Sequence, residues 1–444
     1  MAKKFRKISI VFLLAVLPLQ SFAQEKAQLV LDTAKQQAVV EEVSKLLNEN
    51  YIFPETAKKM EELIRTRLKK GEYKALQNPR DFAAKVMEDL RSVSKDKHLR
   101  FHYEPEAAEQ ITQSKSESEA TVKEARDRQL AAVKRDNFGF RKVERLQGNI
   151  GHIDFRYFAS AADAGETAVA ALGFVANCDA VIIDLRQNGG GDPSQIQLIS
   201  SYFFEEPTHL NDIFTRRENK TENFWTFSYV PGQKLTKADL YVLTSGNTFS
   251  GAEEFSYNMK NLKRATLIGE TTGGGAHPTE PMIVQSQFVL AVPYARAINP
   301  ITKTNWEGTG VTPDIQAPAA QAFDKAYGLA LEKLLTKASD AETKNQIEWV
   351  LTGQKAKMNP VQVSQETLAK YVGVYQDRKI TMENGTLYYQ RLGPKYRLIP
   401  LTLSIFEPEG LEFFRVEFVV KNGTAAELIG LYDNGEREPS KRTQ

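Results

Sequence analysis

The chain has 444 residues, enough for about three domains with hydrophobic cores. Hydrophobic residues make up 41% and charged residues 26%, and Gly and Pro occur at ordinary frequencies, which excludes a disordered, collagen-like or low-complexity protein. The 58 Lys and Arg residues barely exceed the 56 Asp and Glu residues, far from the basic excess typical of nucleic-acid-binding proteins. We therefore expect no nucleic-acid partner.

Residues 1–23 have the pattern of a secretory signal peptide. Basic residues lie near the start, an apolar run extends from Ile8 to Leu19, and the small residues Ser21 and Ala23 favour cleavage after Ala23. A retained membrane anchor is the alternative, but the apolar run is short for about 30 Å of hydrocarbon. We expect an exported protein with no stable membrane span after signal cleavage, periplasmic in a Gram-negative host.

Cys178 is the only cysteine, and it precedes an apolar segment that is predicted to be a strand. Without a partner in the chain it can form no intrachain disulfide, so we expect an inert thiol in the core. No cysteine follows the predicted signal, which argues against a lipoprotein.

Two segments lie between the predicted signal and residue 149. Apolar residues recur at helical spacing with Pro and Gly as punctuation, which predicts an N-terminal helical domain at residues 24–103. Residues 104–148 include a charged, Ala-rich stretch with little apolar face. They are predicted to form a charged linker or a solvated helix, and we favour the linker.

Residues 149–318 alternate between two kinds of segment. Runs rich in β-branched residues, among them NIGHIDF, DAVIIDLR, ADLYVLTS and ATLIGE, are separated by segments with helical spacing, such as TAVAALGFVANC and AEEFSYNMKNLK. This alternation predicts an α/β core with mostly parallel, buried strands.

The C-terminal part has two further patterns. Residues 319–359 return to helical spacing and are predicted to form a helical connector. Residues 360–444 contain short strand-like runs, and the pairs Asn384-Gly385 and Asn422-Gly423 are typical of hairpin turns. They predict a separate antiparallel β domain, whose function cannot be read from its residues.

Ser250 is the strongest candidate nucleophile. It follows a predicted buried strand and begins a predicted helix, so its hydroxyl would lie beside free backbone N–H groups that can stabilise an oxyanion. Gly251 would let a substrate approach closely. Ser250-x-x-Glu253 is also a capping box, and on the spacing alone we favour the capping role.

A serine hydroxyl needs an adjacent base, usually a histidine. The chain has five histidines, each of which could be structural: His98, His102, His152, His209 and His277. His98 and His102 are predicted on one face of a short strand, but no third ligand cluster accompanies them, so a metal site is disfavoured.

Two glycine-rich turns, LRQNGGGDPS and GETTGGGAHP, lack the patterns of phosphate-binding and dinucleotide-binding loops. The first follows a buried strand, and its glycines could present N–H groups as an oxyanion hole. The alternative for any one of these glycines is a simple tight turn.

The motifs DAVIIDLRQNGGG, TSGNTFSGAEEF, RATLIGETTGGGAHP and WEGTGVTPDI, in this order, resemble the tail-specific (C-terminal-processing) serine peptidase family. YIFPETAKKM and FAAKVMEDLRSVSKDKHLRFHYEP are similar to the N-terminal module of its branch that contains interphotoreceptor retinoid-binding protein and tricorn protease. The resemblance covers about residues 30–318. It implies a crotonase-like or Clp-protease-like α/β core, preceded by a helical bundle, with Ser250 as nucleophile.

The resemblance also implies the rest of the site. Many members use a lysine base, but the matching position holds Gly275, so a lysine is not expected. The tricorn-like pattern implies His98 as the base and Glu307 as the residue that orients it, with Glu270 as a second candidate for that role. The implied oxyanion donors are the N–H groups of Gly251 and of Gly189 or Gly190.

The leading hypothesis is an exported serine endopeptidase that cleaves peptides or unfolded polypeptides through an acyl-enzyme at Ser250. No metal or organic cofactor is implied. No PDZ domain is present, so we expect short or unfolded segments as substrates rather than captured C-terminal tails. The alternative is a non-catalytic binding module for apolar ligands or peptides on the same fold, and a weaker one is hydrolysis of an ester or another acyl substrate.

Overall fold

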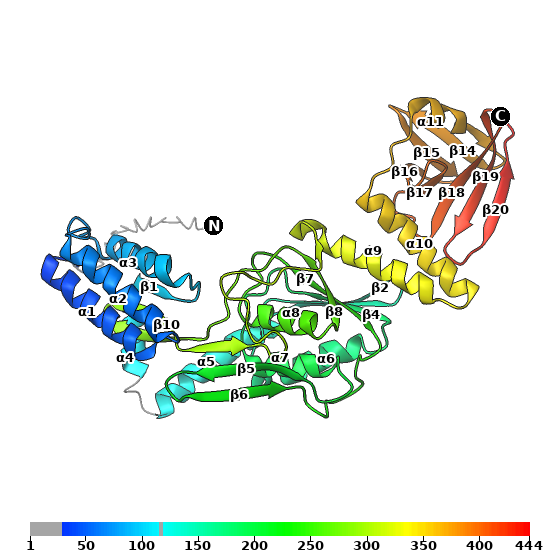
Figure 1. Cartoon of the computed structure of the whole chain (residues 1–444). Coiled ribbons are helices and arrows are strands. Elements are labelled where there is room, and N and C mark those ends of the chain that lie inside the picture. Colours follow the sequence, from blue (N-terminus) through cyan, green and yellow to red (C-terminus); the bar gives the residue numbers. More distant parts are fainter. Residues whose placement is uncertain (1–28, 115–118) are drawn as a thin grey trace, which may run out of the picture.

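The computed structural model describes residues 29–114 and 119–444 (Figure 1). The predicted signal peptide lies outside these residues. Among the helices of the described ranges, none combines the length and the apolar character needed to cross a membrane.

The N-terminal domain packs three helices against a small sheet. The helices are α1 (Thr33–Asn50), α2 (Pro54–Lys69) and α3 (Pro79–Ser94). Asp32 caps α1, and α2 and α3 each begin with proline, whose fixed φ suits the first helical position. Their apolar faces cover a sheet of order β1-β10-β9, made of β1 (Arg100–Tyr103), β10 (Phe288–Pro293) and β9 (Thr279–Val284). Two of its strands therefore come from a segment almost 200 residues further along the chain.

The segment that we expected to be a linker is mostly helical. It contains α4 (Pro105–Ser114) and α5 (Glu119–Arg135), and the residues of α5 whose burial is described are mostly exposed. The preference for a linker was therefore wrong, because helix-forming Ala, Glu, Lys and Arg residues keep a helix without a broad buried face.

The α/β core is built on a six-stranded sheet of order β12-β8-β7-β4-β3-β2. Its strands are β2 (Phe140–Leu146), β3 (Ile150–Phe155), β4 (Ala180–Asp184), β7 (Asp239–Thr244), β8 (Ala265–Gly269) and β12 (Ile315–Gln316). All neighbours pair in parallel except β2, which is antiparallel to β3.

Helices cover both faces of this sheet. On one face lie α6 (Ala161–Phe174), α7 (Pro193–Ser201) and α8 (Gly251–Asn261); on the other lie α9 (Ala319–Lys337) and α10 (Ala341–Met358). Alternate residues of the buried strands face the two layers: Val181 and Ile183 pack with the first, and Ala180 and Ile182 with the second. This explains why the strands are almost wholly apolar.

A second small sheet had no counterpart in the sequence prediction. It has the order β11-β5-β6, with β5 (His209–Thr215), β6 (Lys220–Trp225) and β11 (Ala295–Ile298). Most residues of β6 are exposed, so it lacks the alternation that marks a half-buried strand.

The C-terminal domain is an antiparallel meander of eight strands preceded by α11 (Gln365–Tyr371). The strands are β13 (Gly373–Tyr375), β14 (Arg378–Glu383), β15 (Thr386–Arg391), β16 (Lys395–Pro400), β17 (Ile405–Pro408), β18 (Phe414–Lys421), β19 (Thr424–Tyr432) and β20 (Arg437–Lys441). Tyr375 bridges to Arg442, so the first strand closes onto the end of the last. Figure 1 places this domain at the far side of the core from the N-terminal helices.

Both predicted hairpin turns are present in this domain. Asn384 and Gly385 have φ values of 47° and 77°, and Asn422 and Gly423 have values of 53° and 84°. Positive φ at both central residues is the type I′ pattern that Asn-Gly favours. The predicted fold class, an α/β core with an N-terminal helical region and a C-terminal antiparallel domain, is confirmed.

Candidate active site

Ser250 lies between β7 and α8 in a conformation that few L-residues adopt. Its φ is 53° and its ψ is −120°, so the backbone is held in a sparsely populated region that costs about 1–3 kcal/mol. The hydroxyl approaches the Glu253 N–H as in a capping box, but it makes no hydrogen bond that caps the helix. The strained turn leaves the hydroxyl available beside the free N–H groups of the helix.

The first glycine turn packs directly on this serine turn. A Cβ on Gly190, which has a φ of +99°, would lie 2.6 Å from the Gly251 nitrogen and 2.8 Å from Cβ of Ser250. The Phe249 N–H also donates to the Asn188 carbonyl at 3.1 Å. Only glycine fits at position 190, because any side chain there would push the two turns apart.

The structure changes the predicted oxyanion donors. The N–H of Gly189 donates to the Arg156 carbonyl at 3.0 Å, and the N–H of Gly190 donates to Oδ1 of Asn188 at 2.9 Å. These two groups are already used, so their predicted role does not fit. The Gly191 nitrogen lies 3.0 Å from where a Cβ on Gly251 would be, and its N–H has no hydrogen bond within residues 29–114 and 119–444.

Glu253 joins the second glycine turn to the serine turn. Its buried carboxylate accepts hydrogen bonds from the N–H groups of Ser250 at 2.9 Å, Gly274 at 2.6 Å and Gly275 at 2.8 Å, and from the Thr272 hydroxyl. Burial raises the pKa of Glu253, and these four hydrogen bonds oppose that rise by stabilising the charged form. Glu253, predicted only as part of a capping box, therefore also links the Ser250 turn to the second glycine turn.

His98 lies against the residue before Ser250. The strand β1 begins only at Arg100, so His98 occupies the preceding turn, while His102 is on the strand's exposed face. The rings of His98 and Phe249 have centroids 4.7 Å apart. Within the described ranges no hydrogen bond joins His98 to Ser250, so the predicted contact between base and nucleophile is not made in this conformation.

Gly275, in the second glycine turn, faces His98. A Cβ on Gly275 would lie 2.5 Å from Cε1 of His98 and 2.3 Å from Cζ of Phe249. The side chain of a residue at 275 would thus enter the space that the imidazole and the phenyl ring fill.

Glu307 lies beside His98 as expected. Its Oε2 is 3.9 Å from Nδ1 of His98, and that nitrogen is buried without a hydrogen-bond partner in the described part of the chain. The carboxylate accepts from the N–H groups of Lys97 at 3.2 Å and Ala276 at 2.5 Å. Glu270 is elsewhere: its carboxylate accepts from the N–H groups of Gly246 and Ala319, and within the described residues it makes no hydrogen bond or ion pair with His98.

A second histidine, His277, completes the cluster. Its Nδ1 is 2.7 Å from Oδ2 of Asp96 and 3.5 Å from Oε2 of Glu307. The potential ligand atoms of Asp96, His277 and Glu307 lie within 4.8 Å of one another, close enough to hold a metal ion. The short hydrogen bond between Asp96 and His277 is by itself enough to bring these two side chains together, with no metal ion between them. The sequence analysis did not identify Asp96 as part of this cluster. The one available signal was an acidic residue only two positions before the candidate base His98.

Glu254 is a buried acid on α8 next to Glu253. Burial raises its pKa to about 7, with a smaller opposing contribution from the nearby Asn211 amide. Because the folded pKa lies above the unfolded value near 4.5, the stabilising contribution of this group is complete below pH 4.5. It is lost as the pH rises through 7.

We expect the Glu254→Gln variant to have a flatter pH dependence of stability. Between pH 4.5 and 8 its free energy of unfolding should rise relative to wild type by about 3 kcal/mol. Urea denaturation at several pH values measures this, with Glu62→Gln on an exposed position of α2 as the control. Parallel profiles for Glu254→Gln and wild type would contradict it.

The fold and the serine between β7 and α8 define a peptidase-like α/β protein. Residues 149–317 match the model of peptidase family S41, and residues 21–134 match the model of the N-terminal domain of that peptidase in eukaryotic IRBP. The chain therefore carries a peptidase family S41 domain and a domain like the N-terminal domain of that peptidase in eukaryotic IRBP, and the resemblance inferred from its motifs is confirmed.

The chain is similar to several solved structures. A protein of Parabacteroides merdae ATCC 43184 described as a peptidase superposes with a TM-score of 0.50 at 18% identity, over 69% of this chain and 99% of its own. The photosystem II D1 C-terminal processing protease has a TM-score of 0.42 at 15% identity, over 64% of this chain and 93% of its own. Tricorn protease has a TM-score of 0.39 at 15% identity, over 72% of this chain and 37% of its own.

Proposed function

We propose that this chain is an exported serine endopeptidase with Ser250 as nucleophile, His98 as general base and Glu307 as the residue that orients the base. The single observation that carries the proposal is the approach of His98 to Gly275. Where a lysine base is lost, a serine nucleophile needs another base nearby, and His98 fills the space into which a side chain at 275 would project.

The geometry supports a division of roles within this site. Glu307 faces Nδ1 of His98, which leaves Nε2 to take the proton from the Ser250 hydroxyl. The alkoxide would attack a peptide carbonyl to form an acyl-enzyme, which water then hydrolyses. The N–H groups of Gly251 and Gly191 are the available oxyanion donors. Catalytic hydrogen bonds are often long before substrate binds, so the proposal requires His98 to close on Ser250 in the complex.

Peptides or unfolded polypeptides are the proposed substrates. An extended chain can reach a site between an N-terminal module and a core more easily than a folded domain can. Export to the periplasm rests on the pattern of residues 1–23 alone.

A fluorophosphonate probe tests the proposed nucleophile, because it forms a covalent adduct only with an activated serine. We expect mass spectrometry of the digested protein to find the adduct on the peptide that contains Ser250. Ser250→Ala should remain unlabelled, whereas Ser256→Ala, a change six residues further along and within α8, should not prevent labelling. A wild-type protein that stays unlabelled under conditions that fully label a reference serine peptidase would argue for a non-catalytic family member.

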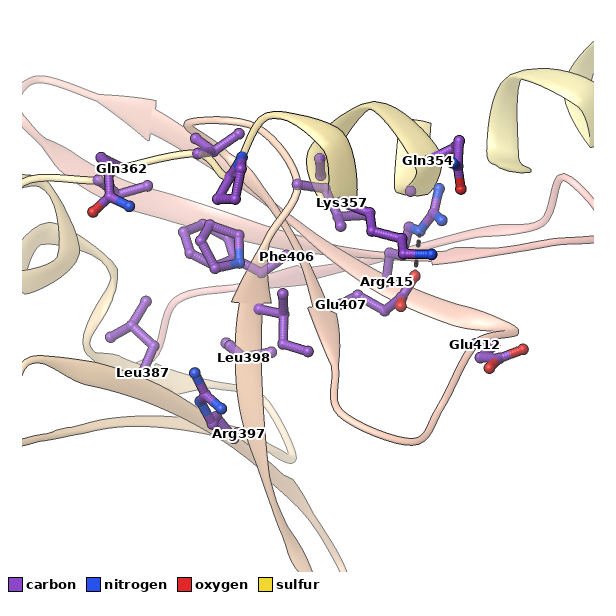
Figure 2. Close-up of a pocket in the computed structure, with 18 of the residues that line it drawn as sticks. Gln354, Lys357, Gln362, Leu387, Arg397, Leu398, Phe406, Glu407, Glu412 and Arg415 are labelled. Carbon is purple, nitrogen blue, oxygen red and sulfur yellow. Dashed lines mark hydrogen bonds and ion pairs between the residues drawn. The ribbon is translucent and has the colours of Figure 1, made fainter. Parts of the chain in front are cut away.

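Binding of an apolar ligand or peptide is the second candidate function, and one cavity favours it. About 800 Å³ of space lies between α10, the segment after it and the C-terminal strands. Figure 2 shows Leu387, Leu398 and Phe406 along this cavity and the ion pair of Arg415 with Glu407, 3.0 Å long, at its side. Native mass spectrometry of the purified protein would reveal a bound ligand under this hypothesis, and a ligand-free mass would count against it.

A further inference from the structure

His277 lies at the junction between the N-terminal domain and the core. It follows the second glycine turn, is almost fully buried, and packs edge-on against Phe53, with ring centroids 5.5 Å apart. Its partner Asp96 belongs to the turn between α3 and β1, about 180 residues earlier in the chain. The hydrogen bond between them therefore ties the turn that carries His98 to the core.

Asp96 uses its two carboxylate oxygens for different tasks. Oδ1 accepts from the backbone N–H of His98 at 2.9 Å and of Leu99 at 3.3 Å, and Oδ2 faces Nδ1 of His277 and accepts from the Tyr51 hydroxyl at 3.1 Å. Burial alone would raise the pKa of Asp96, but its interactions with His277, the His98 N–H and the Tyr51 hydroxyl together outweigh burial, so the net pKa is lowered. An ionised Asp96 can hold the His98 backbone and His277 at once.

His277 also faces the other acid of the site. Its Nδ1 is 3.5 Å from Oε2 of Glu307, the same oxygen that lies 3.9 Å from Nδ1 of His98. Without the imidazole, the carboxylates of Asp96 and Glu307 would face each other in a buried space, where two like charges repel strongly.

We propose that His277 is a positioning residue. It fixes the backbone of His98 through its hydrogen bond to Asp96 and keeps the carboxylate of Glu307 apart from that of Asp96, so that His98 and Glu307 meet across the domain junction. This inference rests on the proposed function for its catalytic consequence. Its structural part, the dependence of the 96–99 turn on His277, can be measured without any activity.

Two variants separate the hydrogen bond from the bulk of the ring. Phenylalanine at position 277 fills similar space without a donor, whereas the amide of asparagine can replace the Nδ1–H. His209 supplies the matched control, because it also pairs with an acid, Asp212 at 2.6 Å, and stacks on Trp225 in the small β5–β6 sheet. His209→Phe therefore removes a comparable pair elsewhere.

The first readout is amide hydrogen exchange of residues 96–99. We expect exchange at the His98 and Leu99 amides to be at least about tenfold faster in His277→Phe than in wild type, because their acceptor Asp96 loses its anchor. His277→Asn should restore most of the protection, and His209→Phe should not change it. Unchanged protection in His277→Phe would overturn the proposal whatever the enzyme does.

The second readout is the rate of fluorophosphonate labelling at Ser250, with peptide hydrolysis beside it. We expect His277→Phe to lower the labelling rate and kcat about 100-fold with KM changed less than about threefold, and His277→Asn to recover part of the loss. Faster amide exchange with an undiminished labelling rate would overturn the catalytic part. Labelling that is absent from wild type would overturn the proposed function instead, while the exchange result would still decide the structural part.

Discussion

Replacing Glu253 with alanine should destabilise the folded chain by about 3–5 kcal/mol. Its carboxylate accepts from three backbone N–H groups and from the Thr272 hydroxyl, all in the buried space between two loops. Alanine would leave these donors without an acceptor, and each unsatisfied buried donor costs about 1–3 kcal/mol before relaxation. The free energy of unfolding from urea titration at pH 7 measures the effect.

Glu254 provides the matched control for this experiment, since it is the next residue on the same helix and is also buried. Glu254→Gln should leave stability unchanged or raise it at pH 7, so only one of the two neighbouring glutamates should cause a loss of stability when it is replaced. A loss below about 1 kcal/mol for Glu253→Ala would mean that water replaces the carboxylate, and that the acid does not hold the two loops together.

Replacing His98 with alanine should lower kcat for peptide hydrolysis by about 10⁴-fold and change KM little. The imidazole is the base that the proposal assigns to Ser250, and its removal leaves the oxyanion donors and the binding of substrate intact. His102→Ala is the matched control, because His102 lies four residues further on with an exposed side chain. We expect that variant to keep wild-type activity.

The kinetics of the two histidine variants distinguish the possible bases. Equal activity of His98→Ala and wild type would contradict His98 as base and would direct attention to His277, the other histidine beside Glu307. A change confined to KM would indicate that His98 contacts the substrate rather than the serine.

The sequence predicted the hairpin turns, the core strands and the place of Ser250, because each depends mainly on residues that are neighbours in the chain. The Asn-Gly pairs form the expected turns because positive φ at both central residues is a property of those residues themselves. The strands of the core were recognised because burial on both faces makes them continuously apolar. The place of Ser250 between a buried strand and a helix followed from the same two patterns.

Long-range pairing could not be predicted in this way. The strand β1 pairs with β10 through Phe101 and Leu290, and nothing in either segment specifies a partner almost 200 residues away. The same pairing is part of the junction where His98 meets Glu307 and where Asp96 meets His277. The N-terminal domain therefore contributes to the site through contacts that only the folded chain reveals.

The sequence of the first glycine turn also does not show which of its backbone N–H groups are free. The run of three glycines indicated exposed N–H groups, but which of them are free depends on where the neighbouring carbonyls lie. Gly189 donates to Arg156 and Gly190 to the side chain of Asn188, which leaves Gly191. A serine that begins a helix raised a similar choice between cap and nucleophile. Here Ser250 and Glu253 are arranged as a capping box: the Glu253 carboxylate accepts from the Ser250 N–H at 2.9 Å, and the Ser250 hydroxyl approaches the Glu253 N–H without a full hydrogen bond.

Digestion of a diverse peptide pool, read by mass spectrometry, tests the central claim most directly. The mature protein and its Ser250→Ala variant are incubated side by side with the same pool, after circular dichroism has shown equal folding. The account predicts new peptide termini in the wild-type sample that are absent from the variant sample, and their sequences would define the cleavage preference. Identical pools in both samples, or equal cleavage by both proteins, would contradict a peptidase that acts through Ser250.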